Sequence, residues 1–143
     1  MHDSRSLGDL DPRVAAMCER HVAACTLVGI HLLVTFTYRS AATQAALYAQ
    51  GRTKPGKVVT NAKAGQSFHN YGLAYDVVPV KPNGAVDYDT TSPAAITRWQ
   101  KIGELGKAQG LRWGGDFHSI RDLPHFEWSG ELSLADLQEG KRP

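Results

Sequence analysis

The chain is poor in cysteine: its 143 residues include only Cys18 and Cys25. A helix through this alanine-rich segment would hold their Cα atoms about 10.5 Å apart, too far for a disulfide, so we expect two buried thiols. No Cys-x-x-Cys pair occurs, which excludes a structural zinc ribbon. Any metal site must therefore use histidine and carboxylate ligands.

A strong charge of one sign and a long apolar run are also missing. Sixteen Lys and Arg against fourteen Asp and Glu leave a formal charge of +2, which argues against nucleic-acid binding through many phosphate contacts. The most apolar segment, residues 21–36, contains polar residues and falls short of the roughly 20 apolar residues that span a bilayer. We therefore expect no stable membrane insertion. The N-terminus has acidic residues and no apolar stretch typical of an export signal.

The length fits a single domain over residues 1–143, with a core at about 9–130 and a tail over 131–143 that forms one short polar helix at most. Caps, prolines, glycines and apolar periodicity predict alternating helices and strands. In chain order these are a helix from Pro12 to near Gly29 after an Asp9 or Asp11 cap, a strand over 30–38, a helix from Ser40 to Gly51, a strand over 73–80, a helix from Ser92 to Gly110, and strand, loop and strand over 111–128. We predict an α+β fold with a short, mainly antiparallel sheet flanked by helices.

The stretch SFHNYGLAYD, residues 67–76, places His69 and Asp76 seven positions apart around Asn-Tyr-Gly. On one straight strand their side chains would lie roughly 23 Å apart, at about 3.3 Å per residue, and would share no ligand. A reversal at residues 70–72 would bring them together, because Asn and Gly tolerate positive φ. The pair would then form half of a metal site. The alternative is a turn histidine and a strand-end carboxylate with structural hydrogen bonds only.

A second histidine, His125, follows Asp122 by three residues in DLPHFEW. Catalytic zinc commonly has three protein ligands, which His69, Asp76 and His125 would supply. A carboxylate away from the metal usually takes the proton of the attacking water, and we predict that Asp122 does so. Its alternative role is to form the turn before the proline. Glu127 is a rival base that strand parity alone does not reject.

These two segments resemble a known family. Residues 67–76 match the Ser-x-His-x-x-Gly-x-Ala-x-Asp motif of the D-Ala-D-Ala metallopeptidase superfamily, and DLPHFEW matches its acid-x-x-His. The resemblance covers about residues 33–128 and is to the L-alanyl-D-glutamate endopeptidase branch, found in phage endolysins and in some bacterial wall hydrolases. It implies zinc on His69, Asp76 and His125 in a surface cleft, with Asp122 as general base. Many carboxypeptidase and dipeptidase relatives carry Glu at the base position, whereas Asp is similar to the endolysin branch.

The resemblance also implies a role for Arg39, in the segment TYRS. It would lie in the cleft and either bind a substrate carboxylate or stabilise negative charge on the carbonyl oxygen, which suits a planar cation in a water-poor site. A surface salt bridge is its alternative role. Ser67 would donate a hydrogen bond to substrate or orient the loop. We expect Gln44 and Tyr48 to pack their helix against the cleft.

We therefore expect a zinc-dependent endopeptidase that cleaves the stem peptide of peptidoglycan between L-Ala and D-Glu. As a monomeric phage endolysin without an export signal, it would stay in the host cytoplasm until a separate protein permeabilises the membrane. A D-Ala-D-Ala carboxypeptidase or dipeptidase is one alternative. A non-catalytic zinc-bearing binding module is another.

Several other polar residues need an explanation. The run DYDTTS, residues 87–92, could attract a regulatory Ca²⁺ within the loop 81–91, or could be a solvated loop with a helix cap. We expect His118 to be a loop residue and His21 and His31 to be core or boundary residues. His2 lies in a terminus that we expect to be disordered.

Overall fold

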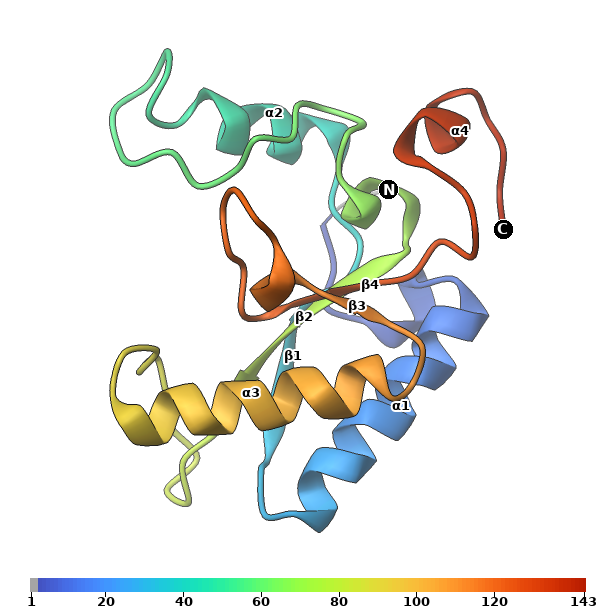
Figure 1. Cartoon of the computed structure of the whole chain (residues 1–143). Coiled ribbons are helices and arrows are strands. Elements are labelled where there is room, and N and C mark those ends of the chain that lie inside the picture. Colours follow the sequence, from blue (N-terminus) through green and yellow to red (C-terminus); the bar gives the residue numbers. More distant parts are fainter. Residues whose placement is uncertain (1–2) are drawn as a thin grey trace.

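The computed structural model describes residues 3–143, so the expectation for His2 lies outside the described residues. Within this range the chain forms four α-helices and a four-stranded antiparallel sheet (Figure 1). The α+β fold class predicted from the sequence is therefore confirmed. No helix among residues 3–143 combines the length and the apolar character that crossing a membrane requires.

The elements are joined by loops of different length, the longest over residues 50–67, and include three 3-10 turns. Their bounds are η1 (Leu7–Asp9), α1 (Pro12–Leu27), β1 (Leu32–Phe36), α2 (Ala41–Ala49), η2 (Phe68–Tyr71), β2 (Ala74–Pro79), α3 (Pro93–Lys107), β3 (Arg112–Trp113), η3 (Gly114–Asp116), β4 (His125–Glu127) and α4 (Leu134–Gln138).

The three long helices begin at predicted capping residues. Asp11, Ser40 and Ser92 each accept a hydrogen bond from a backbone N–H in the first turn of the helix that follows. Such a cap typically contributes about 1 kcal/mol. The first strand is shorter than predicted, because the N–H of Thr37 turns to the carbonyl of Ser4 and leaves the sheet ladder.

The sheet places β2 and β4 at its centre. Its strand order is β1-β2-β4-β3, so β4 inserts between β2 and its own predecessor β3. All six residues of β2 are buried. In the register of β2 and β4, Asp76 lies directly opposite His125. Pairing of these two strands therefore joins the two sequence motifs.

The two faces of the sheet have different neighbours. Helices α1 and α3 lie beside each other on one side, while α2 and the segment after it lie towards the other (Figure 1). Tyr75 and Phe126 contact His21 of α1. Because side chains alternate along a strand, their neighbours Asp76 and His125 point away from these helices. The helical layer thus supports the sheet from behind the site.

A buried histidine lies at the centre of this support. His21 is fully buried, with Nε2 2.8 Å from the Ile102 carbonyl and Nδ1 2.7 Å from the Tyr75 hydroxyl. A carbonyl only accepts, so Nε2 carries the hydrogen and Nδ1 accepts from Tyr75. Burial lowers the pKa of His21 and keeps the ring neutral. The expectation of a core or boundary position is confirmed for His21 and wrong for His31, which is exposed in the connection between α1 and β1.

The cysteines and the aromatic residues near the second motif complete the core. Cys18 and Cys25 are free and buried as predicted, and burial raises their pKa values to about 12 and about 11. Trp113 and Phe126 stack with nearly parallel rings inside the core. Two of the aromatic residues therefore support the site from within, as expected.

The segment 87–92 precedes α3 and ends at Ser92, the N-cap of that helix. Asp89 accepts hydrogen bonds from Ser92 Oγ and from the N–H groups of Thr91 and Ser92, which lower its pKa to about 2. Asp87 contacts Arg98 at 3.1 Å. Both carboxylates thus have protein partners in a helix cap, and this geometry lends the calcium prediction no support.

Candidate metal and catalytic site

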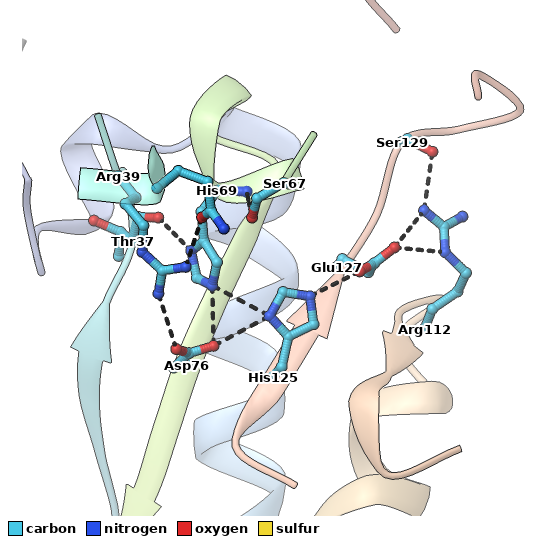
Figure 2. Close-up of polar contacts among 10 residues, drawn as sticks. Thr37, Arg39, Ser67, His69, Asp76, Arg112, His125, Glu127 and Ser129 are labelled. Atoms are coloured by element: carbon cyan, nitrogen blue, oxygen red, sulfur yellow. Dashed lines mark hydrogen bonds and ion pairs between the residues drawn. The ribbon is translucent and has the colours of Figure 1, made fainter. Parts of the chain in front are cut away.

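Two imidazoles and one carboxylate converge above the central strands, as the sequence predicts. His69 Nε2 and His125 Nδ1 lie 3.1 Å and 3.2 Å from the same oxygen, Asp76 Oδ1, and 3.2 Å from each other (Figure 2). One potential ligand atom from each residue falls within 4.8 Å of the other two. This cluster of two nitrogens and one oxygen matches a three-ligand catalytic zinc site.

The turn that carries His69 is built by its neighbours. Ser67 caps η2 by accepting from the His69 N–H, and Asn70 accepts in return from the Ser67 N–H. Only Gly72 adopts positive φ in this turn, at 67°, and a Cβ there would press on the Asp9 carbonyl at 3.0 Å. The chain reversal predicted at residues 70–72 is thus present, with Asn70 acting through its side chain and not through positive φ. Ser67 orients the loop and also lines the cleft.

Hydrogen bonds behind the two imidazoles select their tautomers. His69 Nδ1 lies 2.8 Å from the Thr37 carbonyl, so Nδ1 carries the hydrogen and the Nε2 lone pair faces Asp76. His125 Nε2 lies 2.7 Å from Glu127 Oε1, which directs the Nδ1 lone pair into the same space (Figure 2). The two residues would therefore bind a metal through different ring nitrogens. The donor set and its orientation fit zinc.

The cluster is electrostatically suited to a cation. Burial disfavours the charged form of Asp76, yet the charges and hydrogen bonds of His69 and His125 prevail and lower its pKa far below the usual range. Burial likewise disfavours the His125 imidazolium, but hydrogen bonds to Asp76 and Glu127 raise the pKa of His125 to about 10. The surroundings thus favour positive charge at this point. A divalent cation would take the place of that proton.

Asp122 lies in the loop before β4 and lines the same cleft as His69 and His125. Partial removal from water, followed by the negative charge of Asp76, raises its pKa. The residue is exposed, so solvent limits this effect. Gly114 lies so close to the Asp122 backbone that a Cβ there would overlap it. The structure therefore places a carboxylate of raised pKa beside the cluster.

Arg39 lies in the cleft and is largely buried, so the alternative of a surface salt bridge does not describe it. Its Nη2 is 3.8 Å from Asp76 Oδ2, and its side chain is 14% exposed. Its Nη1 donates to Gln44 Oε1, and Gln44 Nε2 donates to the Ala62 carbonyl. The fully buried Gln44 thus connects Arg39 to the cleft wall, which agrees with its expected packing role.

Glu127 does not have the geometry of a base. Its Oε1 contacts His125 Nε2 and its Oε2 contacts Arg112, on the side of His125 away from Asp76 (Figure 2). Glu127 lines the cleft, but both of its oxygens are engaged by His125 and Arg112, which favours Asp122 over Glu127 as the base. His118 is exposed in the loop after η3, as predicted.

Sequence reasoning missed the contacts that support the ligands. It overlooked the Thr37 carbonyl behind His69 and the Arg112–Glu127 pair behind His125. The alternation of His125 and Glu127 along one strand was a usable signal, since residues two apart share a face. The Thr37 contact comes from a backbone carbonyl, and no sequence signal identifies it.

The cleft runs between two loops. One wall comes from residues 59–62 and 66–68, after α2, and the other from Phe117, Ser119, Ile120 and Asp122, between β3 and β4. Both loops lie on the side of the sheet opposite α1 and α3 (Figure 1). The cleft is therefore lined by both polar and apolar side chains.

Comparison with known proteins assigns this arrangement to a family. Residues 60–128 match the family described as D-alanyl-D-alanine carboxypeptidase. The peptidoglycan L-alanyl-D-glutamate endopeptidase CwlK of Bacillus subtilis is 38% identical over 122 residues, covering 83% of this chain and 73% of CwlK. The chain therefore belongs to the D-alanyl-D-alanine carboxypeptidase family and is a metallopeptidase.

Solved structures share the fold. The L-Ala D-Glu endopeptidase ChiX of Serratia marcescens superposes with a TM-score of 0.65 at 21% identity, covering 94% of this chain and 90% of ChiX. The vancomycin resistance D,D-pentapeptidase VanY, solved with Zn(II), gives a TM-score of 0.61 at 16% identity, covering 91% of this chain and 78% of the VanY chain. At these identities the likeness concerns the fold.

Proposed function

We propose that this metallopeptidase uses zinc to cleave the stem peptide of peptidoglycan between L-Ala and D-Glu. The observation that carries the proposal is the convergence of His69, Asp76 and His125 beside Asp122 in an open cleft. The 38% identity to CwlK supports the choice of the L-Ala to D-Glu bond. The presence of Asp, not Glu, at position 122 agrees with that branch.

In the proposed mechanism, His69 Nε2, His125 Nδ1 and Asp76 hold the metal. Bound zinc supplies Lewis acidity, lowering the pKa of water and polarising the scissile carbonyl. Asp122 accepts the proton of the attacking water and returns it to the leaving nitrogen. Its pKa is raised by burial and by the charge of Asp76, which makes the protonated carboxyl easier to form before the return step. Arg39 donates to the carbonyl oxygen as negative charge develops there.

Asp122→Asn tests the proposed base, because it preserves the shape of the side chain and removes its basicity. We expect kcat to fall by about 10²–10⁴-fold, the usual contribution of general acid–base catalysis, with zinc binding retained. Metal analysis of the purified variant checks the second point. Equal wall hydrolysis by variant and wild type, both loaded with zinc, would favour the non-catalytic binding module and refute the proposed base.

Mass spectrometry of digested stem peptides tests the scissile bond. The expected fragments carry a new N-terminus at D-Glu. A D-Ala-D-Ala carboxypeptidase is the second candidate, favoured by the family description and by the likeness to VanY. It would release terminal D-Ala and leave the L-Ala to D-Glu bond intact, which would refute the proposed specificity while leaving the metal site in place.

We also propose that the protein acts as a monomeric phage endolysin that reaches the wall after a separate protein permeabilises the membrane. Its resemblance to the endolysin branch supports this role. Expression in a Gram-negative host, with and without a permeabilising protein, tests it. Lysis should require both proteins, and lysis by the peptidase alone would contradict the proposed dependence.

A further inference from the structure

A continuous set of polar contacts runs from the buried His125 and Glu127 to the half-exposed Arg112. Glu127 Oε1 is 2.7 Å from His125 Nε2, and Glu127 Oε2 is 3.0 Å from Nη2 and 3.1 Å from Nε of Arg112 (Figure 2). Arg112 Nη2 also donates to Ser129 Oγ, whose hydroxyl donates to the Leu132 carbonyl. Glu127 is only 6% exposed. Every polar atom of its side chain therefore has a partner.

The sheet holds this set of contacts in place. Arg112 of β3 is paired in register with Glu127 of β4, and Glu127 shares a face with His125 two residues earlier. On the far side of β4, Glu127 is paired with Ala74 of β2. The carboxylate is thus fixed by paired backbone on both sides and by a guanidinium at one end. With Oε2 bound to Arg112, the other oxygen, Oε1, faces His125.

The chemistry of this arrangement specifies the state of the imidazole. Burying a carboxylate is costly unless it is paired, and Arg112 provides the pairing. An ionised carboxylate only accepts hydrogen bonds, so His125 Nε2 must carry the hydrogen. The Nδ1 lone pair then faces the space shared with Asp76 and His69. His69 achieves the same result with a neutral backbone carbonyl.

We propose that Glu127, held by Arg112, is a positioning residue that fixes the tautomer and ring orientation of His125 and thereby strengthens metal binding. This inference rests on the proposed role of His125 as a metal ligand. Mutating the carboxylate that holds a metal-binding histidine commonly weakens metal affinity by about 10–100-fold. Glu127 also lines the cleft, but both of its oxygens contact the side chains of His125 and Arg112. It would act entirely through the imidazole.

The competing explanation is that the Arg112–Glu127 pair only joins β3 to β4. Under that explanation, changing Glu127 would lower the stability of the metal-free protein and leave its zinc affinity unchanged. Under the proposal, zinc affinity falls and the coordination of the metal changes. The two explanations therefore differ in a measurement that needs no peptidase activity.

Glu127→Gln is the sharpest variant, because it keeps the shape of the side chain. If the amide oxygen stays on Arg112, the NH₂ group meets the His125 Nε2–H, and two donors then oppose each other. If the amide rotates, the NH₂ group meets the donors of Arg112. Either arrangement disturbs the ring or its support. Glu104→Gln, on the exposed surface of α3, is the matched control.

Zinc affinity of the full chain is measured by competition with a chromophoric chelator, alongside the visible spectrum of the Co²⁺-loaded protein and the Tm without metal. We expect Glu127→Gln to bind zinc about 10–100-fold more weakly and to change the Co²⁺ bands, while Glu104→Gln matches wild type. If wild type binds no zinc, the proposed metal site fails and the inference fails with it.

If wild type binds zinc and Glu127→Gln matches it in affinity and in Co²⁺ spectrum, only the inference is overturned. A lower Tm with unchanged affinity also overturns it, in favour of the strand-joining explanation. Should Glu127→Gln fail to fold, Arg112→Ala provides the comparison, because its side chain is 47% exposed and leaves Glu127 in place. A weaker zinc affinity in Arg112→Ala supports the proposal, and an unchanged one overturns it.

Discussion

Replacing His21 by Phe would test the support behind the site. Phe fills a similar space in the core but cannot form the 2.8 Å contact to the Ile102 carbonyl or the 2.7 Å contact to the Tyr75 hydroxyl. Each buried group left without a partner costs about 1–3 kcal/mol. The two losses amount to roughly 2–6 kcal/mol, less the extra apolar burial that Phe gains. We therefore expect His21→Phe to remove a large part of the free energy of unfolding, which is about 5–15 kcal/mol for a domain.

The pH dependence of this loss is more diagnostic than its size. Burial lowers the pKa of His21 in the folded protein below its unfolded value of 6.5. The unfolded chain therefore binds the proton more readily, so the contribution of neutral His21 is complete above pH 6.5 and is lost as the pH falls towards the lower folded pKa. Phe has no such dependence. The destabilisation by His21→Phe should thus be largest above pH 6.5 and shrink below it.

Urea denaturation of both proteins without metal, across a pH series, measures this difference, because all other titrating groups are shared. His31→Phe is the matched control, since His31 is exposed, and surface changes of this kind are usually within about 0.5 kcal/mol. A destabilisation that does not depend on pH, or one no larger than the control, would refute the assignment of His21 as a buried neutral hydrogen-bonding residue.

Two further substitutions test the core and the cleft. Gly106→Ala should lower the free energy of unfolding by about 1–3 kcal/mol in urea, because its Cβ would overlap the Phe126 ring, whereas Gly8→Ala meets only ordinary contacts. Equal stability of these two variants would contradict the packing of α3 against β4. Arg39→Lys keeps the positive charge but loses the planar guanidinium and its hydrogen bond to Gln44. We therefore expect kcat/KM to fall by about 10²-fold or more with zinc affinity retained. Unchanged kinetics would remove Arg39 from the proposed mechanism.

Local sequence signals determined much of the secondary structure. Ser40, Ser92 and an aspartate at position 9 or 11 predicted the three long helix starts, and the structure selects Asp11, because capping depends on a side chain and the backbone within a few residues of it. Gly72 predicted the reversal that places His69 beside Asp76, because glycine has no Cβ and readily adopts the positive φ that the turn needs. The metal cluster and its neighbouring carboxylate followed from motif spacing together with the chemistry of the ligands.

Only the tertiary structure decided which groups surround each ligand. The insertion of β4 between β2 and β3 sets Asp76 opposite His125 and Arg112 opposite Glu127, and pairing between distant strands leaves no local trace in the chain. The same pairing turns the two oxygens of Glu127 towards His125 and Arg112. Residue type and spacing therefore determined what chemistry the chain could perform. The direction in which each side chain points was decided by strand register, which depends on contacts far apart in the sequence.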